Sequence, residues 1–392
     1  MAVPPKARAR HRVRFDMIRR IGILLLALAG PAVLAQTALA GQFKMPVYYH
    51  AGSLSYSVVA ADFNQDGNLD LAVADWGASQ VSILLGRGDG TFRSARNFSA
   101  PAAIALAVGD FNGDHIPDLA VVQFGGTSDG TLGIYLGDGK GGFRHSATYN
   151  LGVEPVSVVV ADFNGDGVED IAVANRKGFG QSGSQGAVMI FFGEDQGRFK
   201  KPVICKLPGA PHGLAVGDLN GDGSPDLAVT QDAASSVTVL MNRGGGSFRV
   251  GKTYKAGANA TGVALADLNH KGKLDLVVAS TPGAAVLLGN GDGTFNGAKT
   301  YPASFCVEPQ SVAIEDFNLD GNADVAIACL QQDSALFYGK GDGTFGAAVP
   351  IALKSGREAE GVASGHFRRD YGPDLAITIL DDQRVAVLLN TQ

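Results

Sequence analysis

An aspartate-rich loop recurs seven times along the chain, about every fifty residues, and this repetition constrains the fold more than any other feature. Its form is Asp-Phe/Leu-Asn-x-Asp-Gly-x-x-Asp, with positions numbered 1 to 9. The copies are residues 62–70, 110–118, 162–170, 218–226, 267–275, 316–324 and a degenerate 366–374. A unit of this period buries its faces only against its neighbours, so we expect one body of seven units.

Each unit contains four short, β-branched or alternating segments separated by Gly and Asp turns. In the first unit they are residues 57–62, 69–74, 80–85 and 91–98. No stretch after residue 40 combines a helical period with caps. Four antiparallel strands in about fifty residues match one propeller blade, and radial repetition hides the sheet edges. The sequence therefore predicts an all-β, seven-bladed β-propeller of four-stranded antiparallel blades.

The last unit contains three segments, at 361–365, 374–378 and 384–389, and lacks a fourth. Residues 41–49 resemble that missing segment, because Tyr49 follows Phe43 by the same interval that separates Tyr301 from Phe295. We therefore expect the N-terminal strand to complete blade seven as its outer strand.

Residues 1–40 have the layout of a secretory signal peptide: a basic start, an apolar run at 21–29 and a small-x-small pattern at Ala38-Leu39-Ala40. An uncleaved membrane anchor is the alternative. Gly30, Pro31 and Gln36 interrupt the run short of the ~20 apolar residues that a span needs. The expected organisation is a signal peptide at 1–40 and a propeller at 41–392. The mature protein is expected to be secreted or periplasmic, without a membrane span after cleavage.

The leader contains seven of the 32 basic residues and one of the 38 acidic residues, so residues 41–392 have 25 basic and 37 acidic side chains, a formal net charge of −12. An acidic surface disfavours nucleic acid as a partner and suits divalent cations. We expect a monomer.

The chain has three cysteines, Cys205, Cys306 and Cys329. An exported protein could hold one disulfide bond. Cys306 precedes the first strand of unit six and Cys329 ends the second, and such positions approach each other in a hairpin. A bridge between them and a set of three unpaired thiols both remain open. Cys205 occupies a slot that other units fill with Phe or Tyr, so we expect a small core residue there.

The loops carry the oxygen donors of a calcium site: Asp at positions 1, 5 and 9, Asn at position 3 and the backbone carbonyl of position 7. Magnesium demands a stricter octahedron, and zinc is disfavoured because no Cys or His cluster exists. A metal-free Asx-type turn is the plainer interpretation of a single loop. The predicted calcium ligands are Asp62, Asn64, Asp66, Asn68, Asp70, Asp110, Asn112, Asp114, Ile116, Asp118, Asp162, Asn164, Asp166, Val168, Asp170, Asp218, Asn220, Asp222, Ser224, Asp226, Asp316, Asn318, Asp320, Asn322 and Asp324.

The seven loops are not equivalent, and we expect about five calcium ions. Blade two should bind its ion most weakly, because His115 replaces the usual glycine at position 6. Blade five has Lys271 at position 5, where an internal salt bridge could replace the ion. Blade seven has His366 and Arg368 at positions 1 and 3. Neither of these two blades is expected to bind calcium.

These loops, together with the downstream Gly-x-Gly-Asp-Gly-Thr-Phe segments, resemble FG-GAP or VCBS-type repeats, which build the seven-bladed propeller of integrin α subunits and of many secreted bacterial proteins. The resemblance extends over residues 41–392. It implies that calcium lies in the loop between the first and second strands of a blade. The integrin's adhesion partner does not transfer, because the chain lacks the leg region, an inserted domain and a later membrane span.

Calcium is expected to be structural, and a ligand site is expected on the opposite face, where the loops vary. Trp76 lies on such a loop, and the long segments 123–130 and 175–186 form two more. Six residues before each loop comes an irregular set, expected at the mouth of the central channel: Tyr56, Ile104, Val156, His212, Thr261, Gln310 and Glu360. The ligand-binding candidates are Tyr56, Trp76, His212, Gln310 and Glu360, for a protein or glycan partner. Ordinary solvated loops are the alternative.

A polysaccharide-acting lyase or hydrolase is the second functional hypothesis. The histidines are scattered over different units, and Ser182 and Ser184 lack the setting of a nucleophile elbow. A few acidic and basic residues near the expected channel mouth keep the hypothesis open: His212, Glu308, Arg357, Glu358 and Glu360. No catalytic residue is assigned.

Overall fold

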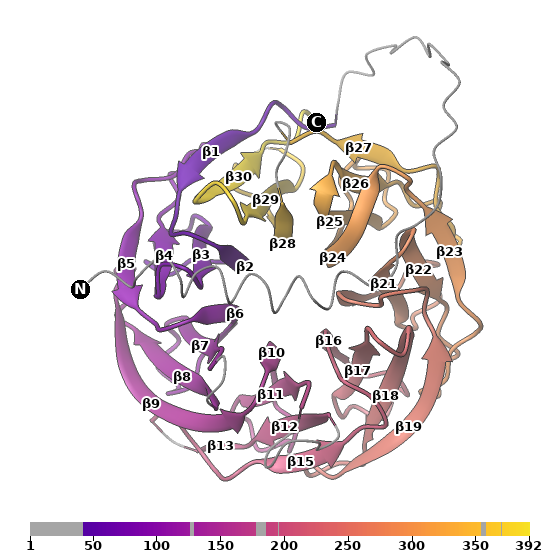
Figure 1. Cartoon of the computed structure of the whole chain (residues 1–392), viewed down its shortest axis with the longest axis horizontal. Coiled ribbons are helices and arrows are strands. Elements are labelled where there is room, and N and C mark those ends of the chain that lie inside the picture. Colours follow the sequence, from indigo (N-terminus) through magenta and orange to yellow (C-terminus); the bar gives the residue numbers. More distant parts are fainter. Residues whose placement is uncertain (1–41, 126–128, 178–185, 195, 354–357, 370) are drawn as a thin grey trace, which may run out of the picture. The chain divides into compact units, whose positions relative to one another are not determined.

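The computed structural model describes residues 42–125, 129–177, 186–194, 196–353, 358–369 and 371–392. Seven four-stranded antiparallel sheets are arranged radially around a common centre, with one strand of each sheet nearest that centre (Figure 1). Gly41–Gln392 form one compact unit. The predicted all-β, seven-bladed architecture is confirmed, and the described residues contain no α-helix. The leader at 1–40, most of the long loop of blade three and Arg357 lie outside the described residues.

Each blade contributes one strand to each of four concentric layers. The inner strands are β2 (Ser55–Ala61), β6 (Ala103–Gly109), β10 (Pro155–Ala161), β16 (Leu214–Gly217), β20 (Val263–Ala266), β24 (Cys306–Glu315) and β28 (Ala359–Gly365). The second strands are β3 (Asp70–Asp75), β7 (Asp118–Gln123), β11 (Asp170–Asn175), β17 (Asp226–Gln231), β21 (Asp275–Ser280), β25 (Asp324–Gln332) and β29 (Asp374–Ile379).

The two remaining layers lie farther from the centre. The third strands are β4 (Gln80–Leu84), β8 (Gly130–Gly137), β12 (Ala187–Phe191), β18 (Ser236–Asn242), β22 (Gly283–Leu287), β26 (Ser334–Phe337) and β30 (Arg384–Leu388). The outer strands are β5 (Arg96–Ser99), β9 (Phe143–Gly152), β15 (Val203–Lys206), β19 (Phe248–Lys255), β23 (Lys299–Pro302), β27 (Val349–Ile351) and β1 (Val47–His50). A short pair, β13 (Gly193–Glu194) and β14 (Arg198–Phe199), precedes the outer strand of blade three.

The core lies between blades rather than within them. The second strands are short apolar runs, and six of the seven are buried at every residue, as expected of strands covered on both faces. The cluster around Phe63 joins residues of blades one and two, such as Val81 and Leu119. Phe63 meets Phe143 of the next blade edge-on, with ring centroids 5.5 Å apart. A single blade therefore has no core of its own.

The N-terminal strand closes blade seven, as the sequence predicts. β1 pairs antiparallel with β30, with Val47 opposite Val387 and His50 opposite Arg384. The ladder is shorter than the expected segment 41–49, because the earlier residues pack between blades instead. Phe43 forms an isolated bridge with Asn390. In blade one, likewise, only the end of the expected segment 91–98 belongs to the outer strand.

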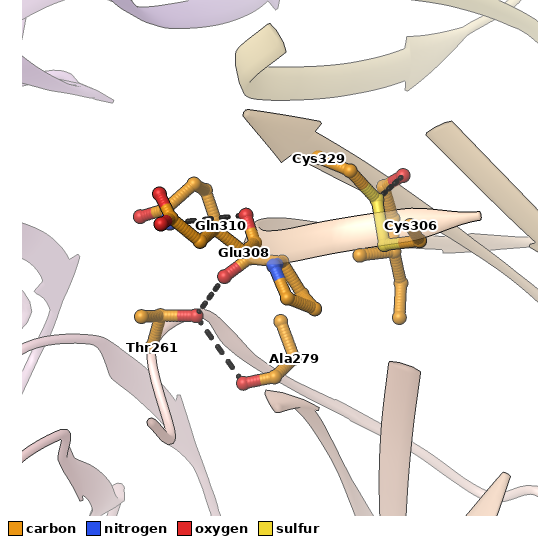
Figure 2. The surroundings of a disulfide bond; sticks show 8 residues. Thr261, Ala279, Cys306, Glu308, Gln310 and Cys329 are labelled. Carbon is orange, nitrogen blue, oxygen red and sulfur yellow. Dashed lines mark hydrogen bonds between the residues drawn. A yellow bond between two sulfur atoms is a disulfide. The ribbon is translucent and has the colours of Figure 1, made fainter. Parts of the chain in front are cut away.

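Blade six contains the disulfide bond that the sequence left as one of two alternatives. Cys306 in β24 and Cys329 in β25 are bridged, with Cα atoms 5.4 Å apart (Figure 2). Cys205 in β15 remains a free thiol and is partly buried opposite Val188. Burial raises the pKa of Cys205 to about 11.

Candidate functional sites

The aspartate at loop position 9 is buried and fastens its loop to the blade. In blade one, Asp70 is fully buried; its Oδ2 accepts a hydrogen bond from the Phe63 backbone N–H (3.0 Å) and its Oδ1 one from Gly86 (2.7 Å). The same two kinds of contact occur in the first six blades. Burial, the largest cause, raises the pKa of five of these carboxyls to about 6: Asp70, Asp118, Asp170, Asp226 and Asp324.

The sequence alone does not reveal this structural role, because the calcium prediction treats position 9 only as a metal ligand. Blade five, which is not expected to bind calcium, retains the arrangement: Asp275 accepts hydrogen bonds from the backbone N–H groups of Leu268 and Gly289. The available signal was that position 9 is aspartate in all seven loops, even where positions 1, 3 and 5 change.

Loop positions 1, 3 and 5 form a series of Asx-type turns at the surface. In blade one, Asp62 Oδ2 accepts a hydrogen bond from Gly67 N (2.7 Å) and Asn64 Oδ1 one from Asp66 N (2.9 Å). Asp66 Oδ1 in turn accepts one from Asn68 N (3.0 Å). Blades two, three, four and six repeat the series.

The donor chemistry of these loops fits calcium, because ionised carboxylates and amide carbonyls keep lone pairs beyond those used by one N–H group. Within the described ranges, no group of three or more Asp, Glu, His or Cys side chains is close enough to hold a metal ion. The loop side chains thus accept hydrogen bonds from backbone N–H groups of their own loop. The position-9 carboxylates also accept backbone hydrogen bonds.

Blades five and seven replace the usual loop contacts in different ways. Lys271 forms no ion pair with any carboxylate of the described residues, so the suggested internal salt bridge is wrong. Instead, Asn269 Nδ2 donates a hydrogen bond to Asp275 Oδ2 (2.8 Å). In blade seven, Arg368 is buried, donates to Asp374 Oδ1 (2.8 Å) and lies over the Tyr371 ring, 4.0 Å from its centroid.

The carbonyl at loop position 2 accepts a hydrogen bond from the next blade in all seven loops. The donor is the last glycine of the Gly-x-Gly-Asp-Gly turn in most blades; Gly141 donates to Phe63 O (3.2 Å) and Gly90 to Phe367 O (3.0 Å). Side-chain amides do this in blades four and seven, where Asn242 donates to Phe163 O and Asn390 to Phe317 O. The turn motif therefore joins neighbouring blades.

Of the seven residues expected at the channel mouth, called the inner ring, five lie at irregularities of the innermost ladders. The register between inner and second strands shifts at Tyr56, Ile104, Val156, Gln310 and Glu360. Thr261 and His212 precede the inner strands of blades five and four, and their backbone N–H groups donate to Ala279 O (3.0 Å) and Thr230 O (2.8 Å) of the second strands. Thr261 Oγ1 donates a hydrogen bond to the carbonyl of Pro309 (2.7 Å), the residue before Gln310, which joins the inner ring of blade five to blade six (Figure 2). Bulges redirect side chains and are common beside functional sites.

The structure brings two of the five ligand candidates together. Tyr56 and Trp76 of blade one meet edge-on, with ring centroids 6.3 Å apart and an interplanar angle of 77°. The Trp76 backbone N–H donates to Leu54 O (3.0 Å), which fixes the turn between β3 and β4. Both side chains are partly exposed.

The other candidates lie in separate blades. His212 is close to the Arg176–Asp232 ion pair (2.8 Å), and burial, followed by the charge of Arg176, holds the pKa of His212 well below its usual range. Gln310 donates a side-chain hydrogen bond to the Glu308 carbonyl in blade six (3.1 Å) (Figure 2). Glu360 is the second residue of β28, the innermost strand of blade seven.

Two surface hollows lie on the aspartate-loop side, rather than on the face that the sequence favoured; the first lies between blades two and three, and the second is lined by blade three. The larger, about 550 Å³, is lined by Asn112, Asp114, Leu136, Arg144, Ser146, Gln196 and Arg198. The second, about 440 Å³, shares Arg198 with the first. The sequence signal for them was the departure of residues 193–199 from the usual turn motif. Among the described residues, no helix has the length and apolarity needed to cross a bilayer.

Several known proteins are similar to this chain. Integrin alpha-PS5 of Drosophila melanogaster is 39% identical over 92 residues, which are 22% of this chain and 9% of that protein. Human phosphatidylinositol-glycan-specific phospholipase D is 29% identical over 171 residues, 36% of this chain and 20% of that protein. The chain thus matches only a fifth or less of the length of these two relatives.

Solved structures share the fold at low sequence identity. One is described as the structural basis of specific recognition of non-reducing terminal N-acetylglucosamine by an Agrocybe aegerita lectin; it has a TM-score of 0.54, 20% identity and coverage of 84% of this chain and 87% of that one. BBS1N in complex with ARL6DN has a TM-score of 0.57, 14% identity and coverage of 89% and 98%. The FG-GAP-like repeat model matches residues 62–121, 110–173, 218–278 and 267–327, more than half of the chain. The chain therefore belongs to the family of FG-GAP-like repeat proteins.

Proposed function

We propose that this propeller is a binding module that recognises a glycan through the face opposite the aspartate loops. The observation that carries the proposal is the Tyr56–Trp76 pair. Both aromatic side chains are partly exposed, and Tyr56 is a member of the inner ring. Aromatic side chains combine a flat apolar surface with a polar edge, which suits a sugar ring that has apolar and hydroxyl-bearing sides. The fold shared with a lectin described as recognising N-acetylglucosamine supports the choice of glycan over protein.

The neighbouring geometry also supports a site at this place. The bulges of β2 and β28 set Tyr56 and Glu360 at the start of adjacent inner strands. Thr378 Oγ1 of blade seven donates to the Tyr56 carbonyl of blade one (3.4 Å), so the two blades are joined there. Because the backbone at Tyr56 is held by both blades, binding of a ligand there has a low entropic cost of ordering the site.

A glycan array with the mature protein, followed by calorimetry on the best ligand, tests this proposal. Trp76→Ala should weaken binding at least about tenfold, since it removes an aromatic contact surface. Leu319→Ala, at a 55% exposed apolar residue of the other face, is the control and should bind normally. Wild-type affinity of Trp76→Ala, or no glycan bound at all, would overturn the glycan assignment.

We also propose that calcium stabilises the propeller. The side chains of positions 1, 3, 5 and 9 and the carbonyl of position 7 would hold it in blades one, two, three, four and six, the residues predicted from the sequence. The donor chemistry of the Asx-turn loops supports this. An ion bound only by the folded chain stabilises it by mass action.

Calcium titration of chelated protein, read by calorimetry and by melting temperature, tests the ion proposal. We expect about five sites and a higher melting temperature with calcium. Asp320→Lys reproduces in blade six the Lys271 of blade five and should remove one site, whereas Asp267→Ala in blade five should leave the number unchanged. Equal stoichiometry in wild-type and Asp320→Lys protein would contradict the assignment.

Export is part of the same proposal. The Cys306–Cys329 bridge supports it, because disulfide bonds persist mainly in oxidising compartments. Mass spectrometry of the protein recovered outside the cytoplasm should find an N-terminus at Gly41. Retention of residues 1–40 would contradict cleavage.

A further inference from the structure

The hollow between blades two and three is polar and has a basic wall. Arg144 on β9 and Arg198 on β14 line it from neighbouring blades, with Ser146 and Gln196 beside them. Arg198 also lines the adjoining hollow, together with Lys200 and the acidic residues Asp166 and Glu194. Both arginines and the lysine are exposed.

These cations form a local exception on an acidic molecule. The mature chain has a net charge of −12, yet none of the three basic side chains forms an ion pair with a carboxylate of the described residues. The Arg198 guanidinium donates a 3.4 Å hydrogen bond to Gln196 Oε1. The guanidinium groups are thus left with donors for an external acceptor.

The third turn of this kind departs from the repeat where it lines the hollow. Blades one, five and six have Asp and Thr at two positions that are Gln196 and Arg198 in blade three. In blade one, Asp89 Oδ1 accepts hydrogen bonds from the Thr91 N–H (2.8 Å) and hydroxyl (2.6 Å), which close the turn. In blade three, Gln196 and Arg198 replace this Asp–Thr pair, and both longer side chains line the hollow.

The basic wall is held by the same contacts that join the blades. Gly197 N donates to Phe111 O of blade two (2.8 Å), and Phe199 N donates to the Tyr149 hydroxyl (2.8 Å). The Phe199 ring is buried and meets Phe111 edge-on at 5.6 Å. Arg198 lies between these two anchored residues, so its backbone is fixed relative to Arg144 of β9. Preorganisation of this kind lowers the entropic cost of binding.

The lining specifies the chemistry of a ligand. Two guanidinium groups favour a carboxylate or sulfate, which they can bind through paired N–H donors. Ser146 and Gln196 offer both donors and acceptors, while Asn112 and Asp114, which also line the hollow, are among the calcium ligands proposed for blade two. A ligand with both anionic groups and hydroxyls can bind the guanidinium groups and the neutral Ser146 and Gln196 together, whereas an anionic peptide has no hydroxyls for these two neutral side chains. The larger hollow, about 550 Å³, is of the size of small-ligand sites.

We propose that the hollow between blades two and three binds an acidic oligosaccharide, with Arg144 and Arg198 holding one anionic group and Lys200 approaching the next along the chain. The site is independent of the Tyr56–Trp76 pair, because it lies on the aspartate-loop side and shares no residue with it. Failure of either site leaves the other untouched.

The test is calorimetry at fixed calcium and low salt, with an oligogalacturonate, a sulfated oligosaccharide and a neutral dextran oligomer of equal length. We expect binding of at least one acidic oligosaccharide and none of the dextran. Comparison of the two acidic probes identifies carboxylate or sulfate as the anion. Poly-glutamate should not bind.

The variants are chosen to keep the fold. The double substitution Gln196→Asp with Arg198→Thr restores the turn of blades one, five and six, and Arg144→Gln removes the second guanidinium. Each should weaken binding about tenfold, the effect of losing a charge-assisted contact. Arg249→Gln alters the residue at the same position of β19, after Phe248 as Arg144 follows Phe143, and should bind normally.

Three outcomes would overturn the proposal. They are wild-type affinity in both hollow variants, equal loss in the Arg249→Gln control, and binding of poly-glutamate or dextran as strong as that of the acidic oligosaccharides. Absence of binding by both acidic probes would overturn it as well. Trp76→Ala should leave this binding intact, which separates it from the glycan site proposed above.

Discussion

Arg368 shows how one residue can take over a role that calcium is proposed to have in other blades. Arg368 is 6% exposed, and its guanidinium is paired with Asp374, which is fully buried. The sequence predicted that blade seven would have no ion, because arginine stands at position 3. It could not indicate that the arginine points inward to the position-9 carboxylate. That contact depends on the C-terminal segment of the same chain, where Asn390 hydrogen-bonds to both Arg368 and Asp374.

Replacement of Arg368 by alanine should lower the free energy of unfolding by about 3 kcal/mol, because the buried Asp374 carboxylate loses its partner. Urea unfolding of the calcium-free protein measures this loss. Arg369→Ala is the matched control: the neighbouring arginine is exposed and reaches Asn68 Oδ1 at 3.2 Å, and its loss should cost less than about 0.5 kcal/mol. Equal effects of the two variants would contradict the assignment.

His212 should make stability depend on pH in the acidic range. Its pKa is lowered in the folded state by burial and by Arg176, so the folded protein resists protonation more than the unfolded chain does. The contribution of His212 is present above the ordinary histidine pKa of about 6.5 and is lost as the pH falls below it. Unfolding measurements at pH 7.5 and 5 should therefore show a smaller loss in His212→Gln than in the wild type. The exposed His145→Gln should behave like the wild type.

At the scale of the element, the turn before each outer strand connects two blades. Its recurrent glycines could be read as a blade turn from the sequence, but their partners could not, because the acceptor carbonyl lies on the loop of the preceding blade. Gly293, for example, donates to Leu219 O at 2.9 Å across the boundary between blades five and four. Sequence periodicity finds such a turn but does not identify the residue against which it packs.

Gly293→Ala should destabilise the protein by about 1–3 kcal/mol. Gly293 has φ of +76°, a left-handed conformation that strains an L-residue, and an added Cβ would lie 2.5 Å from Met241 Cε. Gly297 lies four residues later in the same blade, and an added Cβ there meets no atom within 4 Å. Thermal unfolding of the two alanine variants compares them directly. A melting temperature of Gly293→Ala equal to that of Gly297→Ala would contradict the role of this turn.

At the scale of the whole molecule, the ring is closed by strands from opposite ends of the chain. β1 covers the edge of β30 through four register pairs, and Tyr49 meets Phe92 of blade one at 5.4 Å between ring centroids. Closure therefore joins blade seven to blade one through side chains as well as through the ladder.

Deletion of residues 42–50 should lower the melting temperature of the protein markedly, because β30 becomes an open sheet edge and the aromatic contact with Phe92 is lost. Met45→Ser is the control within the same segment, since Met45 is 70% exposed and outside β1. Thermal unfolding followed by circular dichroism measures both. An unchanged melting temperature after the deletion would show that closure contributes nothing.

The sequence by itself determined the number of blades, the four strands of each blade and the origin of the closing strand, because all three follow from a repeat and from its missing segment. It also identified blades five and seven as exceptions. The tertiary structure decided what the repeated residues contact. The position-9 aspartates are buried and hold their loops by hydrogen bonds, and the glycine turns donate to the preceding blade. The sequence does not show these contacts, because they depend on how the units pack. The basic hollow, likewise, exists only because two outer edges meet. The periodicity of the sequence shows which residues the units have in common. The contacts between units depend on how the propeller fold brings their side chains together.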